Sequence, residues 1–137
     1  MISVLLTDQI INLPDFVAQV ESTSAGAVAT FSGNVRTHDL GKEVSSLSYE
    51  IHPSTEQVLK EVVKDVAQRH QIISVSVAHR FGDIELGQSA LIVAVSAEHR
   101  GEAFATCAEM VDEIKAKIPI WKHQIFADGT DEWVNCA

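Results

Sequence analysis

The chain has 137 residues, 46% of them hydrophobic, and a net charge of −9, which predicts a single domain over residues 1–137 with a substantial core. An acidic chain argues against broad nucleic-acid binding, because that function needs basic groups to neutralise phosphates. No apolar run approaches the length of a membrane span, and no basic segment typical of a signal peptide opens the chain, so we expect a cytoplasmic protein.

The first half of the chain combines strand and helix patterns. Short strands are predicted at residues 2–6, 26–35 and 47–51, and a loop is predicted at residues 36–45. A short helix is predicted from Pro14 to Glu21, because proline suits the first turn of a helix. A longer amphipathic helix begins at Ser54, with Gln57 three residues later as its predicted capping-box partner.

The second half continues the alternation of strands and helices. In chain order we predict a strand at 72–80, a turn between Gly82 and Gly87, a strand from Ser89 to Ala97, a helix at 100–117 and a strand at 120–126. The strand from Ser89 to Ala97 is almost wholly apolar, so we place it at the centre of a sheet. Interleaved strands and helices predict an α/β or α+β fold with a mixed or antiparallel sheet and about three helices.

Two lysines, Lys115 and Lys122, stand on either side of the corner predicted between the last helix and the last strand. On a helical wheel, Lys115 projects at the edge of an apolar arc whose members are Phe104, Cys107, Met110, Val111, Ile114 and Ile118. Lysines that converge on an apolar pocket can bind an anion, or lose a proton and attack a carbonyl. The alternative is a lysine whose stem covers apolar surface while its amine stays in water.

The corner between the two lysines contains Pro119 and Trp121. Proline cannot continue the helix, and tryptophan is a large anchor that can also form one wall of a site for an aromatic ligand. The alternative is a core tryptophan followed by an exposed Lys122.

Two other polar segments follow predicted strands. His99 and Arg100 stand at the start of the last helix, where unpaired backbone N–H groups bind anions and the arginine fork suits phosphate or carboxylate. Alternatively, Arg100 pairs with Glu98 or Glu102. The segment 33–38 follows another strand and is either a ligand-binding loop or an ordinary polar turn.

Several familiar signatures are missing from the sequence. The chain has no phosphate-binding glycine loop, no dinucleotide fingerprint and no Gly-x-Ser-x-Gly elbow. Its histidines lack metal-ligand spacing, and neither Cys107 nor Cys136 suggests a metal site or stands near the two lysines. We therefore expect neither a metal site nor a cysteine nucleophile.

The chain carries a series of segments in a specific order. They are Phe31-Ser32-Gly33-Asn34-Val35-Arg36, Tyr49-Glu50, His79-Arg80-Phe81-Gly82, Ser96-Ala97-Glu98-His99-Arg100, Lys115, Pro119-Ile120-Trp121-Lys122, Asp128-Gly129 and Trp133-Val134. Each segment alone is a weak signal, whereas their order and the spacing of the two lysines are specific. In this order the chain resembles the large, catalytic subunit of molybdopterin synthase, the MoaE family, over roughly residues 3–135.

The resemblance implies an α+β fold of the α/β hammerhead type with an added antiparallel sheet, and a homodimer within a heterotetramer. It implies that each subunit binds MoaD, a small ubiquitin-like sulfur carrier whose C-terminal Gly-Gly thiocarboxylate enters a pocket. The implied sulfurtransferase reaction delivers two sulfurs to cyclic pyranopterin monophosphate and forms the dithiolene of molybdopterin. The pterin is then the substrate, and no metal or nucleotide cofactor is implied.

Three segments match the family's substrate-binding positions. They are Asn34, Val35 and Arg36, then His99 and Arg100, then Lys122, His123 and Gln124. The third segment departs from the pattern, since an acid often stands where this chain has Gln124. Lys115 matches the lysine that is central to catalysis in the family and also belongs to the binding set, and Lys122 is the second catalytic candidate.

The chemistry of the residues agrees with these roles. Pterin phosphate and carrier tail are both anionic, so several cations in one pocket are needed to hold them together. Arg36, His99 and Arg100 are the candidates for anchoring the phosphate. Lys115 can stabilise an oxyanion, shuttle a proton or form a transient adduct with the carrier carboxyl, and Lys122 can hold the tail carboxylate or act as an acid.

Two other readings stay open at this point. One is a dimeric docking module that binds a ubiquitin-like carrier tail without catalysis. The other is a structural domain with a chance basic corner, which predicts that Lys115, Lys122 and Arg100 lie on separate surfaces.

Overall fold

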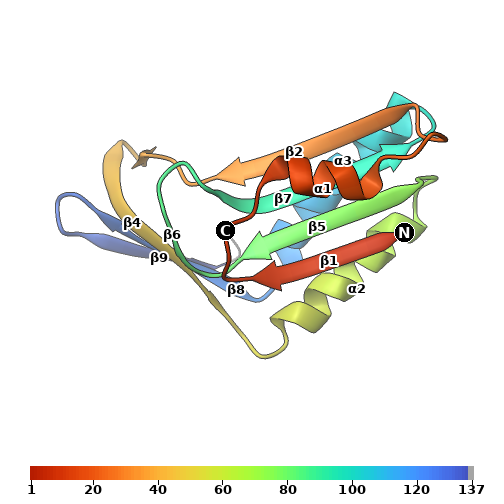
Figure 1. The fold of residues 1–137 in the computed structure, drawn as a ribbon. Helices are drawn as coiled ribbons and strands as arrows, with labels where there is room; N and C mark the ends of the chain where they lie inside the picture. Colours follow the sequence, from red (N-terminus) through yellow and green to blue (C-terminus); the bar gives the residue numbers. More distant parts are fainter. Residues whose placement is uncertain (136–137) are drawn as a thin grey trace.

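The structure, a computed structural model, describes residues 1–135, so Cys136 lies outside the described residues. Within that range the chain forms two sheets and three helices (Figure 1). The elements in chain order are β1 (Ile2–Thr7), α1 (Leu13–Val20), β2 (Ala27–Asn34), β3 (His38–Asp39), β4 (Lys42–Ile51), α2 (Thr55–Gln68), β5 (Ser74–Arg80), β6 (Gly82–Ile84), β7 (Ser89–Ala97), α3 (Arg100–Lys117), β8 (Ile120–Phe126) and β9 (Asp131–Asn135).

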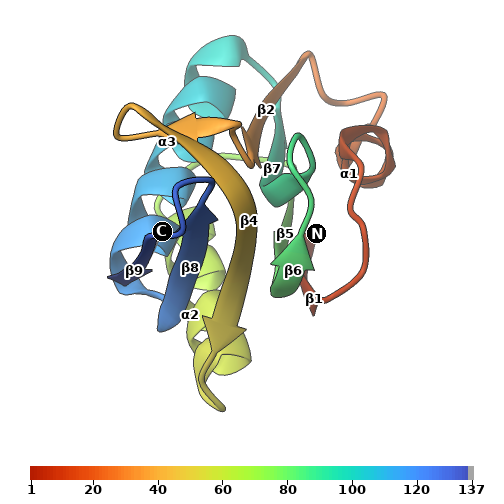
Figure 2. The ribbon, with the colours of Figure 1, turned by 90° about the vertical axis from the view of Figure 1, so that its left-hand side faces the viewer.

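The first sheet has the strand order β1-β5-β7-β2. β1 runs parallel to β5, whereas β7 is antiparallel to both β5 and β2. Figure 2 shows α1 on one face of this sheet and α2 and α3 on the other. The apolar strand β7 is buried on both faces, since Val93 and Val95 join the core under α2 and α3 while Ile92 and Ala94 pack with α1. Its predicted central position is confirmed.

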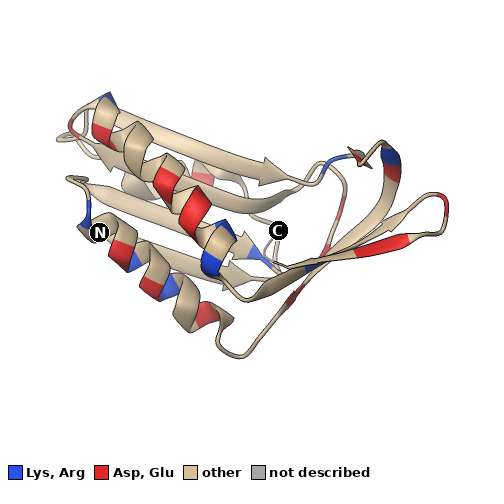
Figure 3. Cartoon of the chain, turned by 180° about the vertical axis from the view of Figure 1, so that it is seen from behind, with Lys and Arg blue, Asp and Glu red and all other residues tan. Residues whose placement is uncertain are grey.

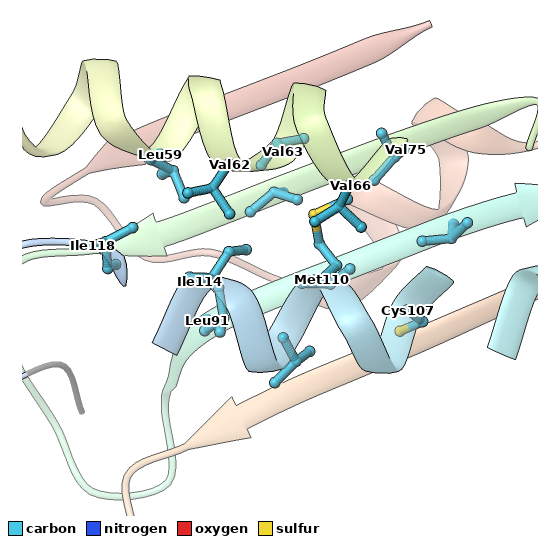
Figure 4. Packing of buried hydrophobic residues seen from close by; sticks show 14 of the residues in the cluster. Leu59, Val62, Val63, Val66, Val75, Leu91, Cys107, Met110, Ile114 and Ile118 are labelled. Carbon is cyan, nitrogen blue, oxygen red and sulfur yellow. The ribbon is translucent and has the colours of Figure 1, made fainter. Parts of the chain in front are cut away.

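The main core lies between the first sheet and the two longer helices (Figure 4). Both helices contribute a stripe of buried side chains, among them Leu59, Val62, Val63, Val66, Met110 and Ile114. Each such side chain contributes about 1.5–3 kcal/mol of hydrophobic stabilisation. The predicted stripe was wrong for Phe104, which is 65% exposed. Phe104 instead borders an open hollow on the surface together with residues of β2, an edge strand of the first sheet.

The second sheet is antiparallel and is built on the long strand β4. β4 pairs with β3, with β6 and with β8, and β8 pairs in turn with β9. This sheet lies at the end of the first sheet where β2 and β5 finish (Figure 1). The expected α+β fold, with mixed and antiparallel sheets and three helices, is confirmed.

Four local predictions differ from the structure. The predicted loop at 36–45 contains β3 and the start of β4, joined by a turn in which Leu40 and Gly41 have φ of 53° and 74°. β6 and β9 were not predicted either. β6 has only three residues, and β9 is rich in Asp, Glu and Asn, which are depleted in strands. The capping box was wrong, since the hydroxyl of Ser54 bonds to His52 Nδ1 at 2.8 Å and the amide of Gln57 donates to Glu61 at 3.0 Å.

A membrane-spanning helix was not expected from the sequence. Among residues 1–135, no helix is both long enough and apolar enough to cross a membrane.

Candidate functional site

A cavity of about 240 Å³ opens where the two sheets and the end of α3 meet. Its walls come from the ends of β2 and β5, the start of β7, the last turn of α3, and the facing strands β4 and β8. The lining residues that carry polar or charged side chains are Asn34, Arg36, His38, Asp39, Tyr49, His79, Lys115, Lys122 and Gln124. Figure 3 shows acidic residues along α3 and basic residues at its C-terminal end. Lys115, in that last turn, lines the cavity.

The two lysines reach the cavity because the chain reverses between them. α3 ends at Lys117, Ile118 is extended, and β8 begins immediately after Pro119. The hydroxyl of Thr55, at the start of α2, donates to the Pro119 carbonyl at 2.7 Å and fixes this corner against the second helix. Lys115 and Lys122 therefore line one cavity from two different elements.

Strand alternation decides which β8 residues face the cavity. Lys122 lies opposite Tyr49 and Gln124 lies opposite Leu47 in the β4–β8 ladder, and all four side chains line the cavity. His123 therefore faces the other side of the sheet, away from the cavity. Its ring stacks on Trp133 at 4.1 Å, and its Nε2 is 2.9 Å from the Asp131 carboxylate. Trp121 is half-buried and does not line the cavity.

The first predicted substrate-binding segment, Asn34 to Arg36, faces the cavity because β2 is irregular at its end. The pairing of β2 with β7 shifts register between Gly33 and Asn34, and such bulges re-aim side chains. Asn34 Oδ1 then accepts hydrogen bonds from Ser32 and Ser89 at 2.8 and 2.7 Å, so the amide is fixed. Val35 and Arg36 follow it along the cavity wall.

His99 and Arg100 do not line this cavity. They stand at the start of α3, whereas Lys115 lies in its last turn. At 1.5 Å per residue, the fifteen residue steps from Arg100 to Lys115 along the helix span about 22 Å. His99 instead borders a separate hollow that also contains Glu98 and Glu102. Within one chain, the second predicted binding segment is too far away to reach the cavity.

Tyr49 and His79 also line the cavity, although neither was predicted to be a site residue. His79 Nδ1 donates to the Arg80 carbonyl at 2.7 Å, and the ring packs edge-on against Tyr49 with 5.3 Å between centroids. Burial, together with the positive charge of Lys115, lowers the pKa of His79 to about 4, so its imidazole is neutral. Burial raises the pKa of Tyr49 to about 12, so its hydroxyl stays a hydrogen-bond donor.

The electrostatics of the cavity favour a reactive amine. Lys115 keeps contact with solvent, yet partial desolvation and then the charge of Lys122 lower its pKa. A lowered pKa increases the neutral, nucleophilic fraction of the amine at a given pH. Cys107 lies outside the cavity, and burial raises its pKa to about 11, which disfavours the reactive thiolate.

A metal site is not evident in the structure. Among residues 1–135, no group of three or more His, Cys, Asp or Glu side chains is arranged to hold a metal ion.

Known proteins resemble the chain in sequence and in fold. The model of the MoaE protein family matches residues 6–117. The molybdopterin synthase catalytic subunit of Pyrococcus abyssi is 36% identical over 126 residues, which cover 90% of this chain and 83% of the relative. A crystal structure of molybdopterin synthase from Staphylococcus aureus matches with a TM-score of 0.84 and 27% identity, over 97% of this chain and 96% of that chain. A Helicobacter pylori structure, described as a complex of subunits 1 and 2 of molybdopterin-converting factor, shares the fold with a TM-score of 0.71 and 18% identity, over 98% of this chain and 88% of that chain.

Proposed function

Since this chain belongs to the MoaE protein family, we propose that it is the catalytic subunit of a molybdopterin synthase and acts in molybdenum cofactor biosynthesis. The proposed reaction is a sulfurtransferase step. Sulfur passes from the C-terminal thiocarboxylate of a small ubiquitin-like carrier of the MoaD type to cyclic pyranopterin monophosphate, and the dithiolene of molybdopterin is formed. The pterin is the substrate, and the proposed step uses no metal or nucleotide cofactor.

One observation carries this proposal: Lys115, Lys122 and Arg36 border a single cavity on an otherwise acidic chain. The two proposed reactants are a phosphate ester and a thiocarboxylate, which repel each other in solution. Cations around one partly desolvated cavity offset that repulsion and hold both reactants within reach. A structural domain with a chance basic corner predicts that Lys115, Lys122 and Arg100 lie on separate surfaces. The two lysines share one cavity, whereas Arg100 lies apart from it at the other end of α3.

The cavity residues suit the breaking of the carrier's acyl–sulfur bond. During that step negative charge develops on the acyl oxygen, and preorganised donors lower its energy. The ammonium of Lys122 and the neutral hydroxyl of Tyr49 are the proposed donors. In its protonated form Lys115 acts as a further donor while water attacks the acyl carbon and sulfur stays on the pterin. In its neutral form the amine itself attacks, an amide forms as the acyl–sulfur bond breaks, sulfur stays on the pterin, and water then hydrolyses the amide to free the carrier carboxylate and the amine. The lowered pKa of Lys115 makes the neutral form more accessible.

A role for His99 and Arg100 at this site requires a second copy of the chain. Within one chain the length of α3 separates them from Lys115. The proposed homodimer resolves this separation if His99 and Arg100 of one copy border the cavity of the other. The carrier then completes the proposed heterotetramer. The H. pylori structure that shares this fold is described as a complex of two different subunits, which agrees with a partner of a second kind.

The alternative of a non-catalytic docking module is tested by reconstitution. The chain is mixed with thiocarboxylated carrier and cyclic pyranopterin monophosphate, dithiolene product is assayed, and carrier binding is measured in parallel. Product that depends on the chain supports the synthase. Carrier binding without product supports the docking module, and the absence of both contradicts the proposed function.

A further inference from the structure

Gln124 is a buried amide that faces two carboxylates. Its side chain is among the largest that are fully buried, with 2% exposure. Its Nε2 group donates to Asp39 Oδ2 and, at 3.1 Å, to Glu132 Oε2. A carboxylate in place of Gln124 would be repelled by the carboxylates of Asp39 and Glu132. The amide of Gln124 instead donates hydrogen bonds to both.

Asp39 connects this amide to Arg36. The second oxygen of the same carboxylate, Oδ1, accepts from Arg36 Nη2 at 3.1 Å. The Arg36 side chain is 74% exposed, whereas that of Asp39 is only 20% exposed. An exposed arginine has many rotamers, and a bond to a better-anchored carboxylate restricts them. The order of contacts is therefore Glu132, Gln124, Asp39 and Arg36, and the last three line the cavity.

The backbone around Asp39 gives this carboxylate a defined place. Asp39 ends the two-residue strand β3, which pairs with the start of β4 through a tight turn. Leu40 and Gly41 in that turn both have positive φ, which fixes the direction of the hairpin. The Gln124 bond then ties the hairpin to β8, the strand that carries Lys122.

We infer that Asp39, held by Gln124, is a positioning residue that fixes the Arg36 guanidinium at the cavity wall, where it binds the anionic group of the substrate. The identity of that group as the pterin phosphate rests on the proposed function. Asp39 itself carries the same sign of charge as the substrate, so its contribution is made through Arg36. Gln124 is accordingly assigned to positioning the hairpin, in place of direct substrate binding.

A double-mutant cycle between Asp39 and Arg36 tests this inference. The substitution Asp39→Asn is expected to raise KM for the pterin about fivefold and to leave kcat within about twofold, because substrate binding is lost and the reacting groups stay in place. In an Arg36→Ala background the same substitution is expected to change KM less than about 1.5-fold. An equal change in both backgrounds would show that Asp39 acts independently of Arg36, and would overturn the inference.

Two further variants keep the test independent of folding defects. Gln124→Met keeps the side-chain volume and removes the donor, so KM should rise as it does in Asp39→Asn, again only when Arg36 is present. Ser45→Ala is the matched control, because Ser45 Oγ donates to the Ile125 carbonyl across the same strand pair, at 2.9 Å, outside the cavity. An unchanged KM in Gln124→Met, or an equal rise in Ser45→Ala, contradicts the inference.

A measurement without substrate separates this inference from the proposed function. Relaxation of the Arg36 side-chain ¹⁵Nε reports its motion in the chain alone. The Arg36 order parameter should fall in Asp39→Asn and in Gln124→Met, and should hold in Ser45→Ala. Equal order in all four proteins overturns the inference even if the synthase reaction is observed. Absence of turnover in every protein counts against the proposed function, while the relaxation result still decides the positioning role.

Discussion

Lys122 on β8 lies directly opposite Tyr49 on β4, and both side chains face the cavity that Lys115 borders from the end of α3. The strand register thus sets a cation beside a phenol that stays protonated. The corner at Pro119 brings a second amine to the same space. This arrangement supplies two cations and a neutral donor where an acyl group and an anion can meet.

Replacement of Lys115 should separate catalysis from docking. Lys115→Ala is expected to lower the rate of dithiolene formation by about 10²–10⁴-fold, the usual contribution of a general acid–base or oxyanion group. Carrier affinity should stay within about tenfold, or roughly 1.4 kcal/mol. Titration calorimetry of the carrier beside single-turnover rates checks both numbers, and a parallel loss of binding and rate would assign Lys115 to docking.

Lys115→Arg distinguishes the two chemical roles of this amine. Arginine keeps the positive charge and is not deprotonated in proteins. Electrostatic stabilisation therefore predicts that most of the rate survives, whereas attack by a neutral amine predicts a loss as large as in Lys115→Ala. A covalent adduct trapped by mass spectrometry in the unmodified protein would independently support the second role.

The charge of Lys122 should be visible in the pH dependence of Lys115. Lys122 lowers the pKa of Lys115, so Lys122→Met is expected to raise it. If the neutral amine is the active form, the single-turnover rate rises with pH through the Lys115 pKa. In Lys122→Met that inflection should then move to higher pH. NMR of the Lys115 side chain measures this pKa directly. The same Lys115 pKa in the unmodified protein and in Lys122→Met would contradict the coupling of the two amines.

The lowered pKa of His79 predicts that the folded chain loses stability in acid. Its pKa is about 4 in the folded chain against an ordinary value of 6.5. Between these values the unfolded chain binds a proton that the folded chain does not, so stability falls as pH decreases from about 6.5 to about 4. The full effect is on the order of 3 kcal/mol. Chemical unfolding of the unmodified protein and of His79→Gln across this range should show a weaker pH dependence in the variant.

Mixed dimers test the place of Arg100. If Arg100 of one copy serves the cavity of the other, a heterodimer of Arg100→Ala and Lys115→Ala chains retains one intact site. Such a mixture should recover a substantial fraction of the unmodified rate, although each variant alone is weak. Absence of any recovery in a mixture shown to contain heterodimers would remove Arg100 from the site.

The residues that the sequence places correctly are those whose relationship is local. Lys115 and Lys122 are separated by a single corner, and proline after an amphipathic helix is enough to predict that the chain reverses there. Ser89–Ala97 is apolar at nearly every position, which indicates a central strand without any knowledge of its neighbours.

Other parts of the site depend on long-range register. His79 shares the parity of Val75 and Val77 on β5, so alternation alone indicates the core side of the sheet, but not that Tyr49 packs against it. Asp39 meets Gln124 across 85 positions of sequence. His99 and Arg100 were grouped with the lysines by charge and by the family resemblance, and neither of these gives a distance. The predicted helix at 100–117 already separates Arg100 from Lys115 by about 22 Å, and the structure confirms that helix.

The central claim is that the cavity bordered by Lys115 is where sulfur is transferred. The most direct measurement compares dithiolene formation by the unmodified chain, Lys115→Ala and Lys117→Ala, with carrier and pterin supplied at saturation. Lys117 is the matched control, because it lies in the same helical turn, pairs with Glu113 and does not line the cavity. We expect product with the unmodified chain and with Lys117→Ala, and a rate at least about 10²-fold lower with Lys115→Ala. Equal rates for all three proteins would contradict it.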